Sequence, residues 1–391
     1  MKKMRVCIIK DTSKPMRGLH GLQTAFRGMP NVEVTGFYDS NSDNIESRME
    51  YVGAKIHYTD METMFQTERP DIVILTSRHS ADHLEQVRMA AKYNCNIYCE
   101  KALVCDLSDG DEILKIVKES GIKLCMAHPC RYAEPYLTMA KLIRTGAIGD
   151  IVSFVARGKC DQRGGGEDMF VLGYHMFDWL LDLFGTPESI YAEITKDGKL
   201  ATKEDILTTD VMNFKASPSE PIGPILGDHI YAMFRFANGI FGSFESRKDL
   251  YDVKNGNSWM GLTVTGTKGS LSVRFEDSFE RKLYICREAV PPESEANFVE
   301  FPIYDNRKVP GAAELDYSIC CFKDSPTVRN FVESNRFAVW DLMNCIGTDK
   351  QPKSNAENAV GVQEIIQAIY LAHFTGAKVT LPLENRKHPL I

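Results

Sequence analysis

The sequence has no basic excess, no long apolar run and no regular cysteine pattern. Its 46 Lys and Arg residues are outnumbered by 53 Asp and Glu residues, which leaves a formal net charge of −7 at pH 7. Nucleic-acid-binding proteins usually carry a basic excess or stripe, so no nucleic-acid partner is expected. The apolar runs, such as residues 72–75, are too short for a membrane span or a signal peptide. We therefore expect a soluble, cytoplasmic protein with no membrane partner.

The 11 cysteines show neither a zinc-binding nor a disulfide pattern. Their number is odd and no export signal accompanies them. Cys95 and Cys99 are four apart, and Cys320 and Cys321 are adjacent, so neither set gives the two spaced pairs of a zinc site. The sequence predicts reduced, mostly buried thiols and no bound metal.

The first third of the chain alternates between strand and helix patterns. Apolar strands separated by helices predict a doubly wound parallel sheet, an α/β domain that we place at residues 1–127. The expected strands are residues 5–9, 32–38, 54–57, 71–75, 96–99 and 123–127, and the expected helices are residues 22–29, 41–52, 81–93 and 109–120.

The rest of the chain, residues 128–391, reads as an α+β domain with a large open mixed or antiparallel sheet flanked by helices. Alternating strands linked by hairpin turns follow a helix at about 133–145, and two further helices close the chain. The clearest strands are residues 151–157, 230–236, 240–246, 260–265 and 270–275, and the closing helices are residues 322–346 and 355–375.

The strand at residues 230–236 has two different faces. Ile230, Ala232 and Phe234 share one face, whereas Tyr231 and Met233 lie on the other. An open sheet with such an outer face would expose a larger apolar patch than monomers usually tolerate. We therefore expect a homodimer or homotetramer that assembles through the C-terminal sheet.

The turn after the first strand carries part of a dinucleotide-binding glycine fingerprint. Gly18 and Gly21 remain, but Lys10 stands where the first glycine is expected, and an ordinary surface loop is an equal alternative. Asp39 ends the second strand, 18 residues after Gly21, where a carboxylate can bind the adenosine ribose. No basic residue follows Asp39 directly, so NAD is favoured over NADP; a turn or helix-capping aspartate is the alternative.

A charged pair, Glu100-Lys101, directly follows the apolar strand at 96–99. Ligands bind at the carboxyl ends of the strands in this fold class, and a desolvated lysine there can act as an acid or base. A solvated surface lysine is the alternative.

A glycine-rich segment followed by an expected helix supplies a second group of polar residues. After three glycines at residues 164–166, the helical spacing of Asp168, His175, Asp178 and Asp182 places them on one face. Three carboxylates and a histidine on one face favour a functional site over a structural helix.

Together these features resemble the Gfo/Idh/MocA family of oxidoreductases. The resemblance covers nearly the whole chain and implies a Rossmann domain, an open mixed sheet and NAD(P)-linked oxidation of sugars, inositols and related polyols. It is carried by Asp39, Glu100-Lys101, Arg131-Tyr132, residues 146–151, the Gly-Gly-Gly…Gly-x-His-x-x-Asp run, residues 266–270 and the C-terminal segment 381–390.

The resemblance also assigns roles to residues. It implies that Lys101 is the catalytic lysine, that His175 is the active-site histidine and that Glu100 lies beside the nicotinamide ribose. Further candidates are Gly18, Gly21, Asp39 and Thr76 for the cofactor and Arg131, Tyr132 and Asp178 for the substrate.

The sequence departs from the family pattern in three places. Lys10 and Asp11 erode the glycine fingerprint, and Ala102 replaces the usual proline, so a trans peptide is expected there. Val171 stands where many members have an aspartate that assists the histidine. Asp168, one helical turn earlier, is expected to take that role and is counted as catalytic, with Glu167 as the less favoured alternative.

The leading hypothesis is an NAD-dependent dehydrogenase that acts on a sugar, an inositol or a sugar derivative. Lys101 would take the hydroxyl proton while hydride passes to the nicotinamide. One alternative is a sugar lyase or hydrolase that retains NAD and works through a transient keto intermediate. Another is a non-catalytic sensor of dinucleotide or sugar. A metal site at His128, His175 and an acidic neighbour remains open, although no spacing demands it.

Overall fold

The computed structural model describes residues 3–14, 22–208, 222–250, 260–275, 281–288, 297–315 and 326–391. Gly18 and Gly21 lie outside the described residues, so the structure does not place the predicted glycine fingerprint. Within the described part, no helix is long and apolar enough to cross a membrane.

The first domain is a six-stranded sheet whose strands are all parallel, in the order β3-β2-β1-β4-β5-β6. This confirms the predicted doubly wound sheet. Its strands are β1 (Met4–Ile9), β2 (Val32–Tyr38), β3 (Ile56–Tyr58), β4 (Ile72–Leu75), β5 (Asn96–Cys99) and β6 (Leu124–Met126). Its helices are α1 (Ile45–Val52), α2 (Met61–Glu68), α3 (His83–Lys92) and α4 (Leu107–Ser120), with short 3-10 turns η1 (Leu22–Thr24) and η2 (Ser80–Asp82).

Two local elements of this domain differ from the sequence predictions. The helix expected at residues 22–29 is the 3-10 turn η1 followed by further turns, because Gly28 has a positive φ of 71° and Pro30 follows. The sequence reading missed α2. Asp60, the residue before this helix, caps it: its carboxylate accepts from the Thr63 amide at 2.7 Å.

The second domain contains a ten-stranded sheet in the order β17-β16-β15-β14-β7-β13-β12-β8-β18, with β9 paired to β8. Only β13 and β7 run parallel; the other described pairs are antiparallel, so the large mixed sheet is confirmed. Its strands are β7 (Ile151–Arg157), β8 (Ser189–Lys196), β9 (Lys199–Leu200), β12 (His229–Arg235), β13 (Phe241–Arg247), β14 (Gly261–Gly266), β15 (Gly269–Phe275), β16 (Arg281–Cys286), β17 (Val299–Phe301) and β18 (Val379–Thr380).

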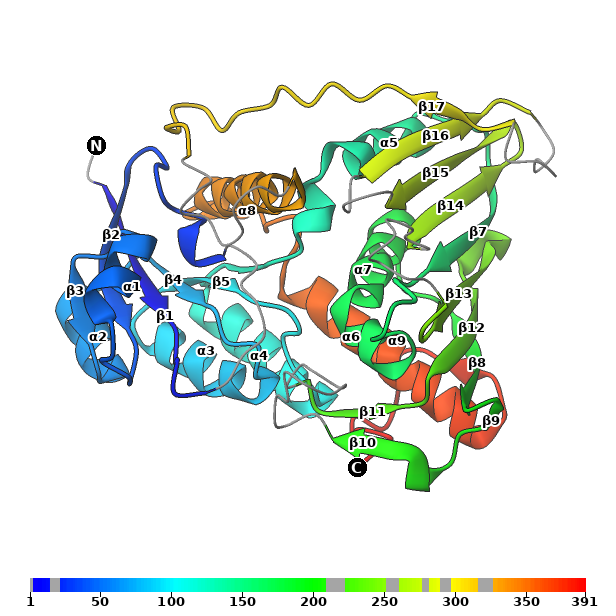
Figure 1. Cartoon of the computed structure of the whole chain (residues 1–391), viewed down its shortest axis with the longest axis horizontal. Helices are drawn as coiled ribbons and strands as arrows, with labels where there is room; N and C mark the ends of the chain where they lie inside the picture. Colours follow the sequence, from blue (N-terminus) through cyan, green and yellow to red (C-terminus); the bar gives the residue numbers. More distant parts are fainter. Residues whose placement is uncertain are drawn as a thin grey trace.

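Helices and short elements complete this domain. Figure 1 shows α6, α7 and α9 between the two sheets, so they cover one face of the ten-stranded sheet. The helices are α5 (Glu134–Arg144), α6 (Gly166–Val171), α7 (Gly173–Phe184), α8 (Pro326–Cys345) and α9 (Ala356–Thr375). The short elements are η3 (Pro129–Tyr132), η4 (Lys203–Asp205), η5 (Ala237–Gly239) and a separate two-stranded ribbon of β10 (Ile206–Thr208) and β11 (Pro224–Leu226).

One helix from late in the chain returns to the first sheet. Ala338, Val339 and Leu342 of α8 belong to a buried cluster with Val6 of β1 and Ile72 of β4. Figure 1 places α8 above that sheet. A division of the chain between residues 127 and 128 therefore leaves out a helix that completes the first domain's core.

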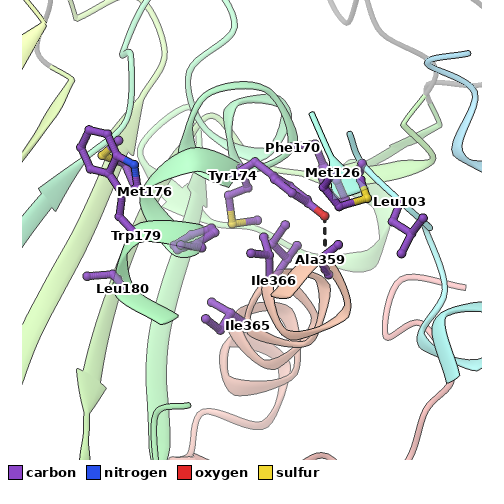
Figure 2. Close-up of a cluster of buried hydrophobic side chains, with 14 of the residues drawn as sticks. Leu103, Met126, Phe170, Tyr174, Met176, Trp179, Leu180, Ala359, Ile365 and Ile366 are labelled. Atoms are coloured by element: carbon purple, nitrogen blue, oxygen red, sulfur yellow. Dashed lines mark hydrogen bonds between the residues drawn. The ribbon is translucent and has the colours of Figure 1, made fainter. Parts of the chain in front are cut away.

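A buried cluster of apolar side chains joins α7 and α9 to the first domain. Figure 2 shows Tyr174 of α7 between Met126 of β6 and Ala359 of α9, with its hydroxyl bonded to the Ala359 carbonyl at 3.2 Å. This packing fixes α7 against the carboxyl end of β6, and α7 carries the predicted site histidine.

Candidate active site

Lys101 extends from the carboxyl end of β5 into the second domain. The Glu100 amide bonds to the Leu75 carbonyl at 2.9 Å, which continues the ladder from β4 and directs Lys101 beyond the edge of the sheet. The Lys101 side chain is buried, and its Nζ donates to the Phe170 carbonyl of α6 at 3.0 Å. A solvated surface lysine is thus excluded, because a buried amine joins the sheet edge to the segment that precedes His175.

The peptide bond between Lys101 and Ala102 is cis, and the trans bond expected from the absence of proline is wrong. A cis bond without proline is disfavoured locally. Here both residues are buried and Lys101 is bonded across the domain junction, so the packing around the bond overrides the local preference.

Asp39 lies at the carboxyl end of β2, as expected, but its carboxylate already has protein partners. Oδ1 accepts from the Thr12 amide at 3.1 Å, the Thr12 hydroxyl at 3.0 Å and the Asn41 amide at 3.0 Å. Oδ2 forms an ion pair with Arg48 of α1. The premise that no cation stands beside Asp39 is therefore wrong: Arg48 is nine residues further along the chain, and α1 brings it back to the strand end.

The remaining cofactor candidates lie at the same edge of the first sheet. The Thr76 hydroxyl follows β4 and donates to the Ile9 carbonyl of β1 at 2.8 Å, and Glu100 Oε1 accepts from the Lys101 amide at 2.9 Å. Carboxylates and hydroxyls at Asp39, Thr76 and Glu100 suit the ribose hydroxyls of a dinucleotide. The donor set described at this edge fits such a cofactor.

Of the residues predicted to share one helix face, Asp168 is separated from the others because the helix breaks at Leu172; His175, Asp178 and Asp182 lie on one helix, as predicted. Asp168 belongs to α6, whereas His175 and Asp178 belong to α7. Asp168 turns toward the second sheet, where Oδ2 accepts from Ser246 at 2.8 Å and from the Lys159 amide at 2.9 Å. A Cβ at Gly158 would lie 1.9 Å from this oxygen, so glycine is required for the approach.

Burial raises the pKa of the Asp168 carboxyl to about 6, with a further increase from nearby Asp161. The sequence reading missed the group around it. Lys159 and Asp161 follow the end of β7, and the Lys159 Nζ lies 2.6 Å from an Asp161 carboxylate oxygen. Burial and the charge of Arg163 lower the pKa of Lys159. The position of Lys159 and Asp161, two charged residues shortly after the end of a strand, could have indicated this group from the sequence.

A second buried group surrounds the start of α7. The Asp178 carboxylate forms an ion pair with Arg131 at 2.9 Å and lies 3.0 Å from the Nδ1 of His128, and Arg131 also pairs with Asp182 at 2.9 Å. Burial alone would raise the pKa of Asp178, but Arg131 and His128 outweigh it and the pKa is lowered. Asp178 is therefore a charged carboxylate inside the protein.

Arg131, Tyr132 and Asp178, which were expected to contact the substrate, all have polar partners within the protein. All three side chains are buried, and the Tyr132 hydroxyl donates to Asp341 of α8 at 2.9 Å. Their polar atoms join η3 to α7 and α8, which gives these residues a structural role; their contact with substrate stays a prediction.

His175 lies in the first turn of α7 and is buried. Its ring meets the ring of His128 at 88°, with the centroids 6.0 Å apart. Among the described residues, no group of three or more His, Cys, Asp or Glu side chains could hold a metal ion. The structure thus brings Lys101 to the α6–α7 segment and sets His175 beside a buried ion-pair group.

Comparison with known proteins identifies the family. Residues 18–128 match the Gfo/Idh/MocA oxidoreductase family's NAD-binding Rossmann fold, and residues 140–381 match its C-terminal alpha/beta domain. The chain belongs to the Gfo/Idh/MocA oxidoreductase family. The first domain is therefore an NAD-binding Rossmann domain, in agreement with the cofactor predicted from the sequence.

Individual relatives match this chain at low sequence identity and over only part of its length. The chain is 26% identical over 209 residues to a scyllo-inositol 2-dehydrogenase (NADP(+)) of Bacillus subtilis, which covers 49% of this chain and 55% of that protein. It is 27% identical over 124 residues to a 2,7-anhydro-N-acetylneuraminate hydratase of Escherichia coli, 32% of each protein. The chain thus spans about half or less of the length of these curated relatives.

Solved structures share the whole fold. A levoglucosan dehydrogenase superposes with a TM-score of 0.71 and 18% identity over 98% of this chain and 100% of the other. At this identity the likeness concerns the arrangement of the two domains alone.

Proposed function

We propose that the protein is an NAD-dependent dehydrogenase that oxidises a hydroxyl carbon of a sugar, an inositol or a sugar derivative, or reduces the corresponding ketone. The observation that carries this proposal is the position of Lys101, a buried amine at the carboxyl end of β5 that reaches the α6–α7 segment. The inositol dehydrogenase among the relatives supports the class of substrate.

Asp39, Thr76 and Glu100 would hold the cofactor at the sheet edge, through the ribose hydroxyls that their oxygens suit. When bound, NAD supplies the hydride acceptor or donor. The chain's own residues then handle the proton: the Nζ of Lys101 accepts it from the substrate hydroxyl during oxidation and returns it during reduction. His175 orients the same hydroxyl or passes the proton on. Burial of both side chains excludes water from the reacting groups.

The test is an absorbance assay for NADH with the purified protein, NAD and a panel of inositols, aldoses, anhydrosugars and uronic acids. The proposal predicts that at least one polyol or sugar gives NADH in amounts many times the enzyme concentration. Absence of NADH with every member of the panel, together with absence of NADH consumption with the matching ketones, would contradict it.

A second candidate function is favoured by the similarity to the hydratase. In that case NAD stays bound, the substrate is oxidised and reduced again in one cycle, and water is added or removed between the two steps. The same panel separates the two candidates, because the product mass then changes by water while no NADH accumulates.

A further inference from the structure

The segment that follows β5 carries Lys101 and is bonded at every second residue to a helix of the second domain. The Nζ of Lys101 donates to the Phe170 carbonyl of α6 at 3.0 Å. A hydrogen bond joins the Leu103 backbone to the Tyr174 hydroxyl of α7. The Cys105 carbonyl accepts from two glutamine side chains of α9, at 2.6 and 3.1 Å. These contacts hold the segment to the second domain.

His83 ties the same segment to the first domain. It lies in the first turn of α3 and has no exposed surface. Its Nδ1 lies 2.8 Å from the Leu103 carbonyl oxygen, and its Nε2 lies 2.9 Å from the Ser77 carbonyl oxygen. Ser77 follows Thr76 after β4, the strand beside β5. The ring therefore bridges two loops that leave neighbouring strands at the carboxyl edge of the sheet.

Both contacts of the His83 ring need hydrogen on the nitrogen. A carbonyl oxygen only accepts hydrogen bonds, so each nitrogen donates to the carbonyl that it faces, and only the doubly protonated ring has two N–H groups. His373 shows the other arrangement. Its Nδ1 accepts from the Ile194 amide at 3.1 Å while its Nε2 faces the Ala201 carbonyl at 2.8 Å, which a neutral ring satisfies.

The Ser77 end of the bridge is fixed by its own side chain. The Ser77 hydroxyl donates to the Asp82 carboxylate at 2.7 Å and accepts from the His79 amide at 3.1 Å. Asp82, which precedes His83, also pairs with Lys14 at 2.6 Å. A carboxylate thus stands at the loop whose carbonyl faces the Nε2 of His83.

We propose that His83 is a positioning residue for Lys101, and that it acts by donating from both ring nitrogens. The bridge locks the segment after Lys101 to the loop that carries Thr76, one of the residues that suit the cofactor ribose. It therefore sets the place of the amine relative to the cofactor edge of the sheet. This inference rests on the proposed function in one respect, namely that Lys101 transfers the proton.

Hydrogen exchange measured by mass spectrometry tests the bridge in the whole protein without turnover. His83→Gly leaves a space with the shape of 4-methylimidazole, which has two N–H groups when protonated. The isomer 1-methylimidazole has the same size but at most one N–H group. Exchange in the peptide of residues 100–106 should rise by about tenfold in His83→Gly, the effect of one lost hydrogen bond to a charged donor. Added 4-methylimidazole should restore protection, and 1-methylimidazole should not.

Turnover provides the second readout. With a substrate that gives NADH, His83→Gly should lower kcat by about 10–100-fold, because the amine is misplaced by a fraction of its reach. The rescue should again require 4-methylimidazole, whereas a ring that only fills space would be replaced equally well by either isomer. His373→Gly removes a ring that also bonds to two backbone groups, but within the second domain, and should leave exchange in residues 100–106 unchanged.

Wild-type exchange of residues 100–106 in His83→Gly, or equal rescue by the two isomers, would overturn the proposal. If His83→Gly does not fold, ¹⁵N spectra of the wild type at neutral pH decide: hydrogen on both ring nitrogens of His83 supports the bridge, and a bare nitrogen overturns it. Isomer-specific protection without NADH formation from any substrate would reject the proposed function alone. NADH formation with equal rescue would reject this inference alone.

Discussion

The Nζ of Lys101 and the backbone carbonyl of Phe170 form a hydrogen bond of 3.0 Å across the junction of the two domains. Lys101 follows β5 of the nucleotide-binding sheet, and Phe170 lies in α6 of the second domain. The amine that we assign to proton transfer is therefore positioned by both domains at once. A change in their relative placement would move this amine away from the end of β5.

The cofactor preference can be tested at Asp39 and Arg48. We expect the wild-type protein to bind NADH more tightly than NADPH, because the Asp39 carboxylate stands where a 2′-phosphate would lie. Arg48 partly neutralises that carboxylate. Arg48→Ala should therefore increase the ratio of NADH affinity to NADPH affinity, and Asp39→Ala should decrease it. Fluorescence titration with both nucleotides measures the ratio. Tighter binding of NADPH by the wild type would refute the preference.

Asp168 predicts an unusual dependence of stability on pH. Its folded-state pKa of about 6 lies above the ordinary value of 3.8, so the folded protein holds this proton more strongly than the unfolded chain does. The contribution of Asp168 to stability is therefore fully present below about pH 4 and is lost as the pH rises through about 6. Above that pH the buried charge costs up to about 3 kcal/mol.

Asp168→Asn removes this charge and keeps an acceptor for Ser246. The variant should be more stable than the wild type at pH 8, and the difference should shrink toward pH 4. Urea unfolding at the two pH values, with Asp161→Asn as a comparison at the neighbouring carboxylate, measures this. An Asp168→Asn variant that is less stable than the wild type at pH 8 and closer to it at pH 4 would contradict the prediction, because the charge would then stabilise the fold.

Variants of Arg131 and Tyr132 can show whether these residues have a structural role or contact the substrate. Arg131→Met leaves Asp178 buried without its cation and should destabilise the protein by about 3–5 kcal/mol. Tyr132→Phe loses one hydrogen bond to Asp341 and should cost about 1 kcal/mol. The folded Tyr132→Phe variant should keep the KM of the wild type. A large rise in KM at unchanged stability would instead support the substrate-binding role.

The outer face of the ten-stranded sheet predicts self-association. Strand register places Tyr191, Met233, Ser243 and Val155 in one row across four strands, and Phe241 follows in the adjacent row. Met233 is 46% exposed and Phe241 is 56% exposed. Such an apolar face suits a symmetric homo-oligomer. Met233→Asp should dissociate it, whereas Val299→Asp on the distant edge strand β17 should not. Sedimentation of the wild type as a monomer of 44.0 kDa would refute the assembly.

Local sequence patterns predicted the strands well where a strand is buried on both faces or on one face only. The fully apolar run of β4 and the alternation in β12 each match the burial of their strands. Patterns failed where a contact comes from far along the chain or where a helix breaks. The Asp39–Arg48 pair depends on how α1 returns to the sheet, and the separation of Asp168 from His175 depends on a break at Leu172.

The site showed the same division between local and long-range information. Lys101 was predicted because the charged residue directly follows a buried strand, a relation that the sequence displays. The contact of His128 with Asp178 joins residues 50 positions apart and depends on how α7 packs against β6. Residue spacing along the chain does not predict such a long-range contact.

Turnover of Lys101→Met tests the central claim most directly. Methionine keeps a long apolar side chain in the buried site but cannot accept or donate the proton. The account predicts that kcat falls by about 10²–10⁴-fold while NADH affinity and unfolding stay close to those of the wild type, and that Lys115→Met on the exposed face of α4 changes nothing. A Lys101→Met enzyme with a near-normal kcat would contradict the assignment of this lysine to the chemistry.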